Sequence, residues 1–125
     1  EGSDIIIFST GTIMTDVIKA AEIIRGKKIK ATVVNIHTIK PLDKNLIIQE
    51  SRFKKHAFVV EEHGKIGGLG SAIAESICDE EDFPQLTLIG TEDKFIKDIG
   101  SQDYLRKVTG LSSDKIASTI IKKLA

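Results

Sequence analysis

Short apolar runs alternate along this chain with segments in which apolar residues recur every three or four positions. The runs are rich in β-branched residues and cover residues 4–9, 31–36, 57–60 and 86–89. Runs of this length are typical of strands buried on both faces, as in a parallel sheet. Helical spacing separates the runs, and two further helices are predicted around 102–108 and 113–124. Strands joined through helices imply right-handed crossovers, so the pattern predicts an α/β fold with three α/β/α layers.

Polar residues and glycines mark the ends of the predicted helices. Gly26 is expected to end the first helix, because glycine is a common residue just beyond a helix C-terminus. Asp43 has the chemistry to cap the second helix, which we expect to carry Phe53. Cys78 lies in the apolar stretch of the third helix, and we expect it to be a small core residue rather than a nucleophile. Ser112 is suited to cap the last helix.

Length and charge limit the classes of function. At 125 residues the chain can form one packed core, so we expect a single domain over residues 1–125. Its 18 basic and 18 acidic residues leave no excess positive charge for a polyanion, and we predict no nucleic-acid partner. No apolar run approaches membrane-spanning length, and we predict no membrane partner. A single cysteine fits a reducing compartment, so we expect a cytoplasmic protein. Either processing or excision explains a chain that begins at Glu1, and we favour excision from a longer polypeptide.

A glycine-rich segment follows the third predicted strand, where that strand should lead into a helix. Its characteristic residues are Gly67, Gly68, Gly70 and Ser71. In open α/β sheets, ligands bind beyond the carboxyl ends of the strands, and a glycine-rich turn there lets backbone N–H groups approach a phosphate. The alternative is that the glycines permit a tight turn and close packing of the next helix. The segment has Ile73 in place of the third glycine of a dinucleotide fingerprint, and it contains no Gly-Lys-Ser/Thr.

Three polar residues, Glu61, Glu62 and His63, end the same strand. Such side chains act as acids, bases or metal ligands. Adjacent strand residues point to opposite faces, so Glu61 and Glu62 are not expected to enter one pocket. His37 and His56 lie in other segments, and we find no second cluster to complete a metal site or a Ser/His/Asp arrangement. We therefore predict no metal-binding residue and no Ser/His/Asp site from these residues. The two hypotheses that remain are a hydrogen-bonding cluster that faces a partner and a solvated loop.

Two longer segments resemble the C-terminal domain of transketolase-like thiamine diphosphate enzymes. Residues 33–43 (VVNIHTIKPLD) are similar to the strand and KPLD turn of that family, and residues 59–75 (VVEEHGKIGGLGSAIAE) to its EEH…GGLGSA segment. Residues 1–11 resemble the family's approach to the first strand. Further along the chain, the family's closing pattern is matched by Phe95, Gly100, Leu105, Gly110, Leu111 and Ile116. The resemblance covers essentially the whole chain.

This resemblance implies a mostly parallel sheet of about five strands, including an antiparallel edge strand that we expect upstream of Glu1. It also implies that thiamine diphosphate and magnesium lie between two other domains of a parent enzyme. This domain is then expected to bind no cofactor and to be inactive alone, and to support packing within a homodimer or heterotetramer. The candidates for contact with another domain or subunit, or for anion binding, are Glu61, Glu62, His63, Gly67, Gly68, Gly70 and Ser71.

The first functional hypothesis is the C-terminal section of a transketolase, which transfers a two-carbon ketol unit between sugar phosphates. The EEH and GGLGSA segments favour it, whereas residues 95–101 favour a deoxyxylulose phosphate synthase, which ranks second. The beta subunit of a 2-oxo acid dehydrogenase ranks third. An alternative from another class is a stand-alone module that binds a phosphorylated ligand, which only the glycine-rich segment supports.

Overall fold

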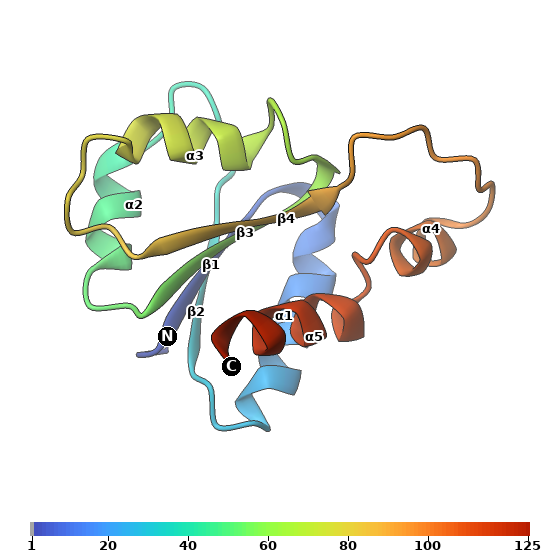
Figure 1. The fold of residues 1–125 in the computed structure, drawn as a ribbon, viewed down its shortest axis with the longest axis horizontal. Helices are drawn as coiled ribbons and strands as arrows, with labels where there is room; N and C mark the ends of the chain where they lie inside the picture. Colours follow the sequence, from blue (N-terminus) through green and yellow to red (C-terminus); the bar gives the residue numbers. More distant parts are fainter. Residues whose placement is uncertain (1) are drawn as a thin grey trace.

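The computed structural model describes residues 2–125, in which strands and helices alternate as predicted (Figure 1). The elements in chain order are β1 (Ile5–Ser9), the 3-10 turn η1 (Gly11–Ile13), α1 (Met14–Arg25), β2 (Ala31–Asn35), α2 (Lys44–Ser51), β3 (His56–Gly64), α3 (Leu69–Ile77), β4 (Gln85–Thr91), α4 (Gln102–Val108) and α5 (Ser113–Leu124). The two closing helices lie where the apolar spacing predicted them.

The strands form one parallel sheet in the order β2-β1-β3-β4. In its centre, Ile7 of β1 pairs with Val33 of β2 on one side and with Phe58 of β3 on the other. Every residue of β1 is buried, which explains its continuous apolar sequence. The sheet has four strands instead of the expected five or so, and residues 2–125 include no antiparallel edge strand.

Helices cover both faces of the sheet and complete the three predicted layers (Figure 1). Ile7 and Phe58 belong to a buried cluster with α1 and α5, whereas Phe8 and Val59 belong to a second cluster with α2 and α3. Neighbouring residues of one strand fall in different clusters because side chains alternate across a strand. Within residues 2–125, no helix combines the length and the apolar composition that a membrane crossing requires.

The helix ends follow the sequence signals in part. Asp43 caps α2 as predicted, since its Oδ1 accepts the backbone N–H of Leu46 at 2.9 Å. Gly26 directly follows α1, but its backbone is still helical, and the left-handed residue of this turn is Lys28, with φ of 64°. Ser112 precedes α5, but its hydroxyl bonds to the Asp114 carboxylate at 2.8 Å instead of a backbone amide.

Two predictions about side-chain burial are wrong. Phe53 lies outside α2, which ends at Ser51, and the Phe53 side chain is 98% exposed. The chain leaves the helix at Arg52, and Phe53 follows in the left-handed conformation with φ of 63°. Cys78 is exposed, because it follows the last residue of α3 and lies about 100° around the helix from buried Ile77. An exposed thiol is not a core residue.

His56 is buried at the start of β3. Its Nε2 lies 2.7 Å from the Thr87 hydroxyl oxygen, and its ring stacks on Phe58 with centroids 4.4 Å apart. Burial lowers the pKa of His56 below the ordinary value of 6.5, and the positive charge of Lys123 lowers it further. Both effects disfavour the imidazolium, so the histidine is neutral in the folded protein at neutral pH.

The free energy of unfolding should therefore fall as the pH drops below about 6.5. There the unfolded chain gains a proton at His56 that the folded chain resists, and stability is lost until the folded pKa is reached. Urea unfolding at pH 7.5 and pH 5.5 measures the loss, and His56→Gln should make it smaller. The matched control is His37→Gln, since His37 is exposed. An equal loss in all three proteins would contradict the assignment to His56.

Candidate functional site

The residues singled out in the sequence meet at the carboxyl edge of the sheet, where β3 ends and α3 begins. A shallow pocket of about 390 Å³ lies there. It is lined by Thr10, Gly11, Thr12, Ile39, Glu61, Glu62, His63, Gly67, Gly68 and Leu69. The edge thus joins the loop after β1 to the loop after β3, as expected for neighbouring parallel strands. Gly70 and Ser71 lie in the first turn of α3.

Glu61 is a buried carboxylate that holds the start of α3. Its side chain is 3% exposed, and its two oxygens accept the backbone N–H groups of Leu69 at 2.7 Å and Gly70 at 3.0 Å. The first N–H groups of a helix have no partner within the helix and carry a partial positive charge, so a carboxylate is well suited to them. Glu61 therefore occupies the amides that a bound phosphate would use.

Two glycines make this contact possible. A Cβ at Gly68 would lie 2.1 Å from Oε2 of Glu61, and a Cβ at Gly70 would lie 2.7 Å from a methyl group of Leu88. Both distances are too short for any side chain without movement of a neighbour. Of the two readings of the glycine-rich segment, close approach of the chain accounts for these positions in the fold.

Ser71 closes the same loop from the helix side. Its hydroxyl oxygen accepts the backbone N–H of Gly67 at 2.8 Å, and the hydroxyl donates to the carbonyl of Lys65 at 3.3 Å. Gly67 has φ of 80°, a left-handed conformation that favours glycine. Ser71 thus satisfies one amide and one carbonyl of the loop.

Glu62 points the opposite way from Glu61 and pairs with Arg106 of α4. Arg106 donates from Nη2 and Nε to the two Glu62 oxygens at 2.7 and 3.0 Å. It also donates from Nη1 to Asp16 and from Nη2 to the Thr12 hydroxyl, both at 3.0 Å. A guanidinium presents donors in a fixed planar fork, which suits this two-oxygen contact. Arg106 is 6% exposed and ties α4 to the ends of β3 and α1.

The pair changes the acidity of both groups. The hydrogen bonds from Arg106 lower the pKa of the Glu62 carboxyl, and Glu62 raises the pKa of the Arg106 guanidinium. Glu62 is therefore held as a carboxylate, which makes it a poor proton acceptor for acid–base chemistry. Sequence reasoning missed Arg106, whose partners lie 44 and 90 residues away. The sequence shows Arg106 only as one charged residue of a short predicted helix, and this does not indicate a buried ion pair.

The alternation of Glu61 and Glu62 is confirmed, since their carboxylates bond to elements on opposite sides of β3. Both residues nevertheless line the same pocket, so the expectation that they would not share one was wrong. His63 is exposed, and its Nδ1 lies 2.7 Å from the carbonyl oxygen of Gly64. Across residues 2–125, no group of three or more His, Cys, Asp or Glu side chains is placed to hold a metal ion.

Known proteins are similar to this chain in sequence and in fold. The profile of the family described as "Transketolase, C-terminal domain" matches residues 1–116. A 1-deoxy-D-xylulose-5-phosphate synthase from Caldanaerobacter subterraneus subsp. tengcongensis is 38% identical over 98% of this chain and 20% of the relative. The 6-deoxy-6-sulfo-D-fructose transketolase subunit SqwH from Clostridium sp. (strain MSTE9) is 38% identical over 93% of this chain and 35% of that subunit.

A solved structure described as a split gene transketolase, inactive beta4 tetramer, superposes with a TM-score of 0.87 and 30% sequence identity. The match covers 98% of this chain and 39% of that one. The chain thus spans only a fifth to two fifths of the proteins to which it is similar. The family profile and the superposed structure each match nearly the full length of the chain. The chain therefore belongs to the transketolase C-terminal domain family.

Proposed function

We propose that this chain is the C-terminal section of a transketolase-type thiamine diphosphate enzyme that transfers a two-carbon ketol unit between sugar phosphates. In this proposal the domain packs against other sections and supports subunit assembly, and it performs no chemistry of its own. The observation that carries the proposal is that both carboxylates at its carboxyl edge are already bonded to groups of the domain itself. Glu61 is bonded to the α3 amides, and Glu62 is paired with Arg106.

The amides at the start of α3, where a glycine-rich turn lets backbone N–H groups approach a phosphate, are not free for the diphosphate of thiamine diphosphate. The amides of Leu69 and Gly70 are already bonded to Glu61. We therefore assign the cofactor, which supplies the carbanion chemistry, to the other sections of the enzyme.

Isothermal titration calorimetry of this chain with thiamine diphosphate and magnesium should give no saturable heat. The physical reason is that the amides of Leu69 and Gly70, at the start of α3, are already bonded to Glu61. The complete enzyme is the positive control and should bind the cofactor under the same conditions. Saturable binding to the isolated chain would contradict the division of roles between the sections.

The second candidate is a 1-deoxy-D-xylulose-5-phosphate synthase, because such an enzyme matches 98% of this chain at 38% identity, compared with 93% at the same identity for the transketolase subunit. A 1-deoxy ketose carries a methyl group, so its two-carbon donor must be an acetyl equivalent rather than a ketol. An assay of the complete enzyme therefore separates the two reactions. Ketol transfer from a ketose phosphate to an aldose phosphate supports the first proposal, and condensation of a 2-oxo acid with an aldose phosphate, with release of CO₂, supports the second.

A stand-alone phosphate-binding module is the remaining alternative. It requires the loop amides of α3 to be free, whereas Glu61 and Ser71 already accept hydrogen bonds from the loop and helix amides. A denaturing blot of native extract tests it directly. A band much heavier than 13.7 kDa supports a section of a larger enzyme, and a band at 13.7 kDa favours the module or a split subunit. Titration with sugar phosphates, monitored at Gly67–Ser71 by NMR, then distinguishes these two.

A further inference from the structure

A segment of apolar side chains projects from the carboxyl edge between β4 and α4. We call residues 92–101 the arm, and Figure 1 shows it extending away from the sheet. Every residue from 92 to 100 is exposed. The Phe95 and Ile99 side chains are 95% and 96% exposed, and Ile66, in the neighbouring loop, is 76% exposed. Exposed apolar side chains that lie together mark a site of association in soluble proteins, and Ile66 and Phe95 line one pocket here.

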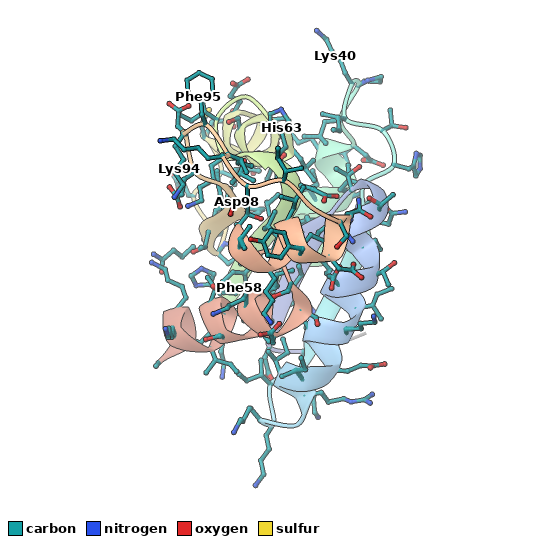
Figure 2. The ribbon with its side chains drawn as sticks, turned by 90° about the vertical axis from the view of Figure 1, so that its right-hand side faces the viewer. Lys40, Phe58, His63, Lys94, Phe95 and Asp98 are labelled. Carbon is teal, nitrogen blue, oxygen red and sulfur yellow. The ribbon has the colours of Figure 1, made fainter. Side chains whose placement is uncertain are left out.

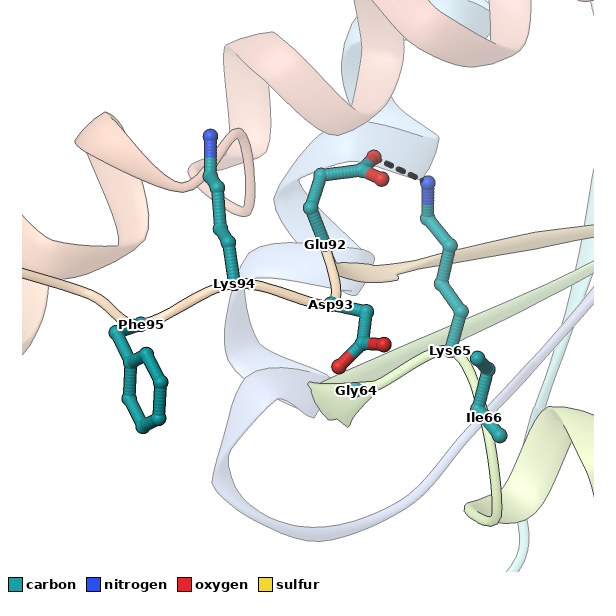
Figure 3. Close-up of a pocket in the computed structure, with 7 residues that line it drawn as sticks. All are labelled: Gly64, Lys65, Ile66, Glu92, Asp93, Lys94 and Phe95. Atoms are coloured by element: carbon teal, nitrogen blue, oxygen red, sulfur yellow. Dashed lines mark hydrogen bonds and ion pairs between the residues drawn. The ribbon is translucent and has the colours of Figure 1, made fainter.

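The two ends of the arm are fastened. Next to β4, Glu92 forms an ion pair with Lys65 (Figure 3). At the other end, Gly100 lies so close to the ring of Tyr104 that a Cβ there would be 2.6 Å from the ring. The Tyr104 hydroxyl donates to Asp98 at 3.3 Å. The middle of the arm is thus presented from a fixed base, and Figure 2 shows Phe95 at the periphery of the molecule.

Hollows flank the arm on both sides. One, of about 430 Å³, lies between the arm and the end of β3 and is lined in part by Ile66 and Phe95. The other, of about 340 Å³, lies between the arm and the end of α4 and is lined in part by Phe95, Ile96 and Val108. Phe95 borders both hollows. A partner that contacts Phe95 from either side would therefore bury further apolar surface.

We infer that the arm is the element through which this domain docks on the remaining section of its transketolase-family enzyme. This inference rests on the proposed function. The chain covers 20% of the synthase and 39% of the split gene transketolase, so most of each related protein lies outside it. The charges of the arm nearly cancel, with Glu92, Asp93 and Asp98 against Lys94 and Lys97. The expected receptor is therefore an apolar cleft rather than a phosphate or a charged surface.

The expected partner is the remaining section of the enzyme rather than a second copy of the domain, because most of each related protein lies outside this chain. The other fully exposed aromatic, Phe53, precedes the opposite, amino-terminal end of β3. Phe53 therefore cannot extend the apolar surface of the arm, and it serves as a matched control.

The test uses the complete enzyme, whether its sections lie on one chain or on several. A photoreactive phenylalanine, p-benzoylphenylalanine, replaces Phe95 in one sample and Phe53 in another. After irradiation, mass spectrometry should find position 95 linked to enzyme peptides outside residues 1–125, and position 53 not linked to them. Links from position 95 to a second copy of residues 1–125, or no links, would overturn the inference.

Where the sections are separate chains, a second measurement follows the strength with which they assemble. F95S/I99S should raise the concentration for half-assembly in sedimentation by about tenfold or more, while F53S leaves it within about twofold. Unchanged assembly of F95S/I99S would overturn the inference even if position 95 cross-links. The two-carbon transfer activity of the unmodified enzyme tests the proposed function separately. If the enzyme is active but F95S/I99S leaves its assembly unchanged, only the docking role is refuted. If the unmodified enzyme has no two-carbon transfer activity, the proposed function is refuted.

Discussion

Glu61→Ala is expected to lower the free energy of unfolding by about 3 kcal/mol. The substitution removes the acceptor of two buried backbone N–H groups, those of Leu69 and Gly70. A buried donor left without a partner costs about 1–3 kcal/mol, and here two are left at once. The negative charge that offsets the positive end of α3 is lost as well. Urea unfolding at pH 7.5 measures the change.

Two further variants make this result specific to the hydrogen bonds. Glu61→Gln keeps one acceptor oxygen but turns an amide N–H₂ towards the helix, so it should lose roughly half as much stability. Glu75→Ala is the matched control, because Glu75 lies on the same helix and is exposed. It should change stability by less than about 0.5 kcal/mol. If Glu61→Ala unfolded at the same urea concentration as wild type, the bonds from Glu61 would not hold α3 in place.

The role of Glu61 was only half accessible from the sequence. Its position at the end of a predicted strand followed from the apolar run of β3, and the glycines after it indicated a close approach of the chain. The glycine-rich sequence did not indicate which group lies against the glycines. The carboxylate of Glu61 itself fills the space beside Gly68, so this is a contact between a strand end and a helix start eight residues later. Such a contact depends on the conformation of the loop between β3 and α3. The spacing of apolar residues along the sequence does not predict that conformation.

The fold was predictable for a related physical reason. Strands buried on both faces need continuous apolar runs, and helices packed on a sheet need apolar stripes, so β1 and α5 are visible in the sequence. Errors occurred where an element ends. Phe53 continued the apolar spacing of α2, but the chain leaves the helix at Arg52, whose ψ of 134° is extended. The strand count inferred from the family also exceeded what residues 2–125 contain.

Arg106→Met is expected to lower the free energy of unfolding by about 3 kcal/mol at pH 7.5, because it leaves the carboxylates of Glu62 and Asp16 close together without a cation. Methionine fills much of the same volume, so the loss reports the charge and hydrogen bonds more than a cavity. Arg106→Lys keeps the charge but cannot contact both Glu62 oxygens through a planar fork, so it should lose an intermediate amount. Lys107→Met, on the exposed side of the same helix, is the control.

The pH dependence of this loss identifies its origin. Arg106 lowers the pKa of Glu62 below the ordinary value of 4.5, so the pair stabilises the fold above that pH. As the pH falls through the lowered pKa, Glu62 takes up a proton and the contribution disappears. The stability difference between wild type and Arg106→Met should therefore be largest near neutral pH and should shrink below about pH 4.5. A difference that is constant from pH 7.5 to pH 3.5 would mean that Arg106 acts through packing alone. A shrinking difference would show that a charged contact holds α4, and with it the base of the arm, against the sheet.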